Sequence, residues 1–213
     1  MSIFKQTAKP AGEGGNFPIA TAGTHSAVLV AIVDLGTKKD RYQDSGKEFT
    51  ARKVFFCWEL EDTDAKEGGP RFFAGADYTL SFGERAKLRQ LVENWRGNKF
   101  KDGDNFDVDK LLGQPCLLQI THKTTSAGRT VAQIVSAAKL AKGMVKIAPT
   151  HPLFISELGD GKTLPEWLPY LYGRPLADHI ADCEEMKAAS PDGDPATGAP
   201  VEVEVGGDAD IPF

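Results

Sequence analysis

The chain has 213 residues, of which 41% are hydrophobic and 26% are charged, close to the averages of globular proteins. This length allows one substantial core, so we expect a single domain with appended segments. The 25 basic and 30 acidic residues give a net charge of −5, which argues against a uniformly basic nucleic-acid binder. Six of the acids lie in residues 191–213, which contain no Lys or Arg, so an acidic end follows a body of almost neutral charge.

The sequence carries no signal for a membrane protein or for a disulfide framework. Residues 1–22 are polar and rich in Gly and Pro, and the longest apolar run, residues 27–33, is too short to span a bilayer. The three cysteines, Cys57, Cys116 and Cys183, are odd in number and widely spaced, without a CxxC pair. We therefore expect a soluble cytoplasmic protein with free thiols.

The first part of the chain predicts three strands. Residues 25–35 are apolar on both faces and close at Gly36, as in a central strand. Residues 37–50 are highly charged and contain a Ser-Gly turn signal, so a long hairpin loop is expected there. Residues 52–60 alternate, with Phe56 and Trp58 on the more apolar face, and residues 71–82 alternate with Tyr78 and Leu80 on theirs.

The pattern then changes to that of a helix and afterwards returns to strands. Within residues 83–97 the apolar stripe of an amphipathic helix is formed by Leu88, Leu91, Val92 and Trp95. Residues 115–122 and 129–136 are strand-like and are separated by the polar hairpin 123–128.

Three strands, one helix and two strands is the element order of an OB-fold, a five-stranded Greek-key barrel with one helix between strands three and four. Other small barrels remain alternatives on this pattern. We assign residues 1–22 to a flexible N-terminal arm and residues 23–148 to the mainly β OB-fold domain. Residues 149–190 are expected to form a helical extension, with an apolar stripe at Leu176, Ile180 and Cys183, and residues 191–213 a disordered acidic tail.

The last six residues carry the most specific motif of the chain. It ends Asp208-Ala-Asp210-Ile211-Pro212-Phe213. This ending resembles that of bacterial-type single-stranded DNA-binding proteins, which typically finish Asp-Asp-Asp-Ile-Pro-Phe. A flexible acidic segment with a terminal apolar plug and a free carboxylate also suits a basic-rimmed hydrophobic pocket on a partner. The alternative is a solubilising tail that happens to end in Phe.

A second resemblance concerns the body of the chain. Residues 34–37 (Asp-Leu-Gly-Thr), Tyr42, residues 52–54 (Arg-Lys-Val) and residues 58–60 (Trp-Glu-Leu) look like a group of phage-encoded proteins associated with replication. The two resemblances together imply a phage-encoded single-stranded DNA-binding protein. It would work in the bacterial cytoplasm, in replication, recombination and repair, and would recruit partner proteins through the tail residues Asp208, Asp210, Ile211, Pro212 and Phe213.

The candidate DNA surface follows from the expected fold. OB-folds bind oligonucleotides across strands two and three, between the loops that join strands one to two and four to five, and both loops are basic here. Tyr42 and Phe55 are the expected base-stacking aromatics. The alternatives are that Phe55 packs beneath the extension and that Tyr42 only braces its hairpin. The predicted DNA-binding residues are Lys38, Lys39, Arg41, Tyr42, Arg52, Lys53, Phe55, Lys123 and Arg129.

Enzymatic alternatives are weakly supported. Residues 159–163 resemble the end of a P-loop, but Ser156 stands where that motif needs Gly. His179 and Cys183 have the spacing of a metal-ligand pair, with no second pair nearby. We expect a non-enzymatic protein without metal or cofactor. The alternatives are a recruitment adaptor or structural phage protein that docks on host replication machinery and, third, a nuclease; homo-oligomerisation is left open.

Overall fold

The computed structural model describes residues 19–41, 46–63, 71–101, 103–125, 128 and 130–189. These residues form one sheet, with the strands β1 (Gly23–Arg41), β2 (Glu48–Thr63), β3 (Arg71–Thr79), β4 (Pro115–Thr124), β5 (Thr130–Ala138) and β6 (Phe154–Ser156). The helices are α1 (Lys87–Arg96), the 3-10 turn η1 (Val108–Leu111), α2 (Leu176–Ala181) and α3 (Glu184–Ala189).

β1 is the central strand of the sheet, whose order is β3-β2-β1-β4-β5. It pairs antiparallel with β2 and β4, and its middle pairs in parallel with the short β6. The β1–β2 register shifts between Leu29 and Ala31 and again between Asp34 and Gly36. Gly36 has a φ of 71°, and a Cβ atom there would lie 2.6 Å from the Cβ atom of Cys183. Only glycine therefore suits this bulge, which lets the α2–α3 junction approach β1 closely.

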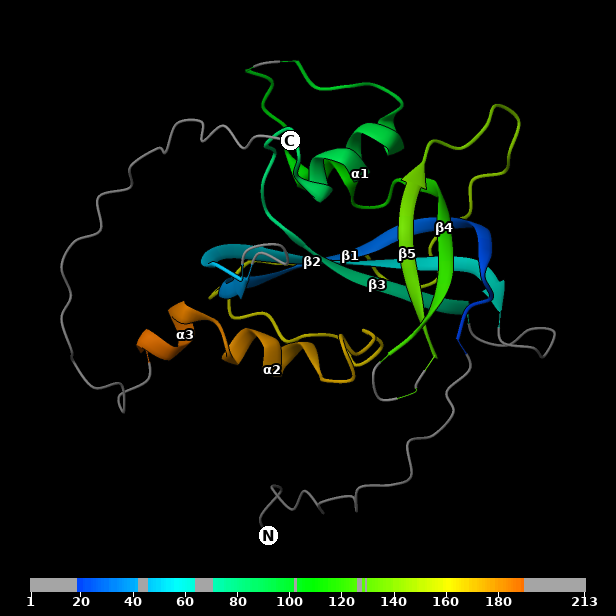
Figure 1. The fold of residues 1–213 in the computed structure, drawn as a ribbon. Coiled ribbons are helices and arrows are strands. Elements are labelled where there is room, and N and C mark those ends of the chain that lie inside the picture. The colour runs from blue at the N-terminus through cyan, green and yellow to red at the C-terminus, as the bar shows by residue number, and fades with distance from the viewer. Residues whose placement is uncertain are drawn as a thin grey trace, which may run out of the picture.

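Each face of the β1–β2–β3 region is covered by its own core. On one face Leu29, Ile32 and Trp58 pack against the apolar stripe of α1, where the rings of Trp58 and Trp95 lie 6.1 Å apart. On the other face the strand residues pack against the C-terminal extension, in a second core formed by Val28, Val30, Ala31, Val33, Leu35, Phe55, Cys57, Leu168, Leu171 and Leu176. Figure 1 shows α1 on one side of these strands and α2 and α3 on the other.

The mainly β class and the helix between β3 and β4 are confirmed, but the sheet does not close into the predicted five-stranded barrel. Among the described residues β3 and β5 are the two edges of the sheet. Their Cα atoms come within 8 Å, but no ladder joins the two strands. In a closed barrel the apolar inner face of the sheet is buried by curling around onto itself. Here α1 covers one face of the long strands and the extension covers the other, so both apolar faces are buried without closure.

Two further sequence predictions are revised. The expected hairpin loop at residues 37–50 is largely strand, because β1 runs to Arg41 and β2 begins at Glu48. Over its described residues, 149–189, the extension is helical only in the short α2 and α3. Most of the N-terminal arm and the whole acidic tail lie outside the described residues. No helix in the described part of the chain is long and apolar enough to cross a membrane.

The extension is fastened to the sheet by a buried carboxylate. Glu59 on β2 is fully buried and accepts hydrogen bonds from the backbone N–H of Thr150 (2.9 Å), the Thr150 hydroxyl (2.7 Å) and Arg71 (2.9 Å). Burial raises the pKa of Glu59, but these bonds outweigh it and hold the pKa below its ordinary value. Beside it the ring of Trp167 stacks on that of Phe73, with centroids 5.3 Å apart.

Candidate nucleic-acid interface

Three of the predicted DNA-binding cations are already paired with carboxylates. Cross-strand geometry in the β1–β2 hairpin brings Arg41 to Glu48, Arg52 to Asp34 and Lys53 to Asp40. The hydrogen bond from Lys53 lowers the pKa of the Asp40 carboxyl below its ordinary value. Asp40 therefore stays ionised and neutralises a lysine whose side chain is only 14% exposed. These cations stabilise the hairpin and add little net positive charge to its surface.

Lys38 and Lys39 instead line a cleft of about 630 Å³ at the end of β1. The cleft contains four cations, two carboxylates and one histidine, contributed by β1 and by the extension: Lys38, Lys39, Arg174, His179, Asp182, Glu184 and Lys187. Arg174 pairs with Asp182 at 2.8 Å, and Lys187 lies 3.9 Å from the same carboxylate. With a neutral histidine, the lining carries a net charge of +2.

His179 links the two sides of the cleft through its two ring nitrogens. Its Nε2 atom lies 2.9 Å from the carbonyl oxygen of Leu171, and its Nδ1 atom lies 3.5 Å from the Lys38 ammonium. A proton on Nε2 donates to the carbonyl and leaves Nδ1 as an acceptor for Lys38, so we assign the neutral Nε2–H tautomer. Burial lowers the pKa of Lys38 below its ordinary value, while the nearby Asp77 and Asp182 oppose that shift.

The N-terminal end of α3 is bonded to β1 next to the cleft. Glu185 of α3 accepts hydrogen bonds from the Thr37 hydroxyl at 2.7 Å and from the Thr37 backbone N–H at 2.9 Å. These bonds lower the pKa of Glu185 to about 2. A carboxylate that remains ionised at neutral pH thus fixes α3 beside Lys38 and Lys39. The two sides of the cleft come from distant parts of the sequence: Lys38 and His179 are 141 residues apart.

The structure places Phe55 in the second core and not on a ligand surface. The ring is 0% exposed, and a Cβ atom at Gly75 would lie 2.4 Å from its Cζ atom and 3.4 Å from Pro169 of the extension. Neither face of the ring is open to a base, so the prediction that Phe55 stacks on a base is wrong. The alternative, that Phe55 packs beneath the extension, is what the structure shows.

Of the remaining predicted residues, only Lys123 is described, and it does not line the cleft. The register pairs Gly23, the first residue of β1, with Ile120 of β4, so Lys123 lies beyond one end of β1 and Lys39 near the other. Lys123 is exposed and has no ion pair among the described residues. Tyr42 and Arg129 lie outside the described residues, as do Asp208, Asp210, Ile211, Pro212 and Phe213.

Sequence reasoning missed the part of the cleft that the extension supplies. Arg174, His179 and Lys187 belong to residues 149–190, which were expected to form a helical extension packed on the barrel or on another subunit, and of the three only His179 was weighed as a ligand-binding residue, for a metal. One local signal was present: residues 170–174 read Tyr-Leu-Tyr-Gly-Arg, in which two aromatics and an arginine flank a turn-forming glycine. A basic residue beside aromatics is typical of single-strand recognition.

The described residues contain no group of three His, Cys, Asp or Glu side chains that could hold a metal ion. The three cysteines are buried and unpaired, and burial raises the pKa of the Cys57 and Cys116 thiols. Comparison of the chain with known protein families and with curated proteins gave no match.

Proposed function

We propose that the chain is a non-enzymatic, sequence-independent single-stranded DNA-binding protein that coats replication or recombination intermediates and recruits partners through its C-terminal tail. The observation that carries this proposal is the cleft, where four cations from distant parts of the chain line one depression. Cations held in a groove attract the phosphate backbone whatever the base sequence.

Two further features support the proposal. The element order of three strands, a helix and two strands is that of the OB-fold, which is itself a partly open barrel, and β3 and β5 approach each other here without pairing. We therefore propose an opened variant of that fold. The tail ending in Asp210, Ile211, Pro212 and Phe213 resembles the partner-docking end of bacterial single-stranded DNA-binding proteins.

The mixed charge of the cleft favours a single strand over a duplex. A duplex presents a rigid array of phosphates that a lining of net charge +2 matches poorly, whereas a flexible strand can bend its phosphates toward Lys38 and Lys39 and turn its bases to nearby aromatic faces. We expect little preference among base sequences, because backbone contacts carry no sequence information.

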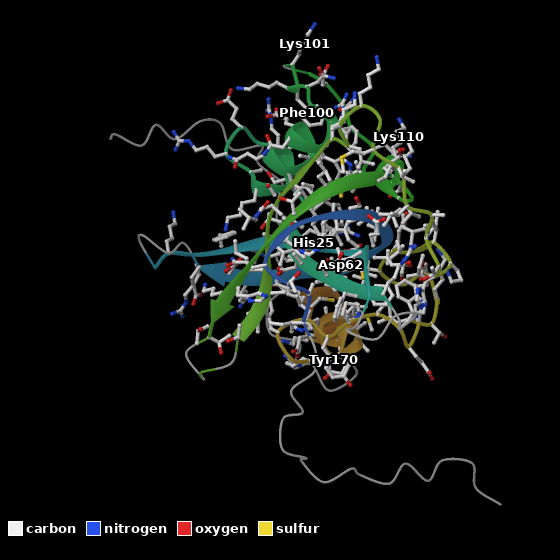
Figure 2. The ribbon with its side chains drawn as sticks, turned by 90° about the vertical axis from the view of Figure 1, so that its right-hand side faces the viewer. His25, Asp62, Phe100, Lys101, Lys110 and Tyr170 are labelled. Carbon is white, nitrogen blue, oxygen red and sulfur yellow. The ribbon has the colours of Figure 1, made fainter. Side chains whose placement is uncertain are left out.

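Fluorescence anisotropy with a labelled oligothymidylate, and with a duplex of equal length as competitor, tests the proposal. The single strand should bind more tightly than the duplex at about 0.15 M salt. Lys39→Glu should weaken binding. Lys110→Glu makes an equal charge change at an exposed residue of η1, at the α1 side of the molecule, and should not weaken it (Figure 2). Equal affinity for the duplex, or equal effects of the two variants, would refute the proposal. No binding at all would leave the recruitment adaptor as the better interpretation.

A further inference from the structure

An unusual backbone turn stands beside the cleft. Leu171 and Arg174 exchange two backbone hydrogen bonds, of 2.9 and 3.0 Å, across the dipeptide Tyr172-Gly173. Both central residues have positive φ, 53° for Tyr172 and 79° for Gly173, as in the two-residue hairpin turns that favour Asn-Gly. Among the described residues other than glycine, Tyr172 alone has a positive φ. A bulky residue in this conformation is strained.

Burial does not compensate for that strain, because Tyr172 is 80% exposed. The ring is nevertheless held in place: its hydroxyl donates to Asp77 at 2.6 Å, and it makes a T-shaped contact with the ring of His179, with centroids 6.4 Å apart. His179 lines the cleft and also bonds the carbonyl of Leu171. The turn therefore adjoins the cleft through His179 and Arg174, and the largely exposed Tyr172 side chain stands next to these lining residues.

We infer that Tyr172 is the residue on which a nucleobase stacks when a single strand lies in the cleft. This inference rests on the proposed function and replaces the role expected of Phe55. A strained backbone at an exposed side chain lowers the stability of the fold, so its presence beside the cleft points to a role in binding. The neighbouring Tyr170 is also 68% exposed, but its backbone is not in the left-handed region.

The turn supplies a variant that separates folding from binding. Tyr172→Asn places the preferred residue at this position, so the melting temperature should stay equal or rise. Affinity for an oligothymidylate should fall by about 5- to 150-fold, the range measured for the loss of one stacked base. Tyr172→Phe keeps the ring and should bind within about twofold of the wild type, while Tyr170→Asn is the matched control and should bind like the wild type.

An abasic oligonucleotide of the same length provides the second readout. It offers phosphates but no bases, so Tyr172→Asn should bind it as the wild type does, even if the variant were less stable than expected. Equal losses on both oligonucleotides, no loss on oligothymidylate, or a loss that follows Tyr170→Asn instead would overturn the inference. Failure of the wild type to bind either oligonucleotide would instead overturn the proposed function.

Discussion

Raising the salt concentration from about 50 to about 200 mM should weaken binding of a single strand by about 7- to 50-fold. The magnitude follows from the cleft. Its four cations are opposed by two carboxylates, so between two and four phosphates are neutralised. At about −0.7 per phosphate, the slope of log affinity against log salt should lie between about −1.4 and −2.8.

The salt slope distinguishes binding by the cleft cations alone from binding that also uses the paired cations of the β1–β2 hairpin. If all seven basic residues predicted from the sequence contacted phosphates, the slope would be about −4.9 and the loss about 900-fold. The structure removes Arg41, Arg52 and Lys53 from that count, since each already faces a carboxylate. Arg41→Ala should therefore leave the slope unchanged, whereas Lys39→Ala should flatten it by about 0.7.

Anisotropy titrations of a labelled oligothymidylate over a series of sodium chloride concentrations, at constant pH, measure this slope directly. A slope steeper than about −4 would show that the hairpin ion pairs open and that their cations follow the strand, which would refute their assignment to hairpin stability alone. A slope near zero would show that binding does not depend on the cleft cations at all.

Three other outcomes are expected. Phe55→Ala should lower the free energy of unfolding by about 3–5 kcal/mol, measured by urea denaturation, because it empties a fully buried site; a variant as stable as the wild type would contradict the second core. Glu59→Gln should cost about 1–3 kcal/mol at pH 7. The low folded pKa of Glu59 means that its contribution is present above its ordinary pKa of 4.5 and is lost as the pH falls through the lower folded value, so wild type and variant should converge in acid; parallel pH profiles would refute this. Deleting residues 208–213 should leave single-strand affinity unchanged or slightly higher while abolishing capture of the tail's protein partner, and Phe213→Ala should do most of that damage; a deletion that loses DNA affinity and keeps the partner would reverse the assignment.

Local periodicity was sufficient for the order of β1 to β5 and α1, whereas the short β6 was not predicted. The apolar stripe of Leu88, Leu91, Val92 and Trp95 is the buried face of α1, and alternation located β2 and β3. Residues 37–41 and 48–50 were wrongly assigned to a loop, because single-sequence patterns do not register cross-strand pairs such as Arg41 with Glu48, which extend the ladder.

The site was harder to predict because it depends on a long-range contact. Alternation along β2 placed Phe55 on the less apolar face, and only the extension, more than a hundred residues later, makes that face a core. One signal was available in the sequence: β1 is apolar on both faces, and Val33 of its second face pairs with Phe55. A strand that is apolar on both faces must be covered on both, so its neighbour could not remain open there.

The same strand, apolar on both faces, has a consequence for synthesis of the chain. β1 and β2 leave the ribosome early, but the residues of the extension that cover their second face are made about a hundred residues later. At bacterial to eukaryotic elongation rates the interval between Arg41 and Cys183 is about 7 to 30 s. During that interval the second face of β1 and β2, which includes Val28, Val30 and Phe55, is not yet packed against the extension. The nascent chain therefore exposes an apolar surface to which other proteins can bind. Chaperones that hold exposed strands should therefore associate with the ribosome-bound chain until the extension emerges and displaces them.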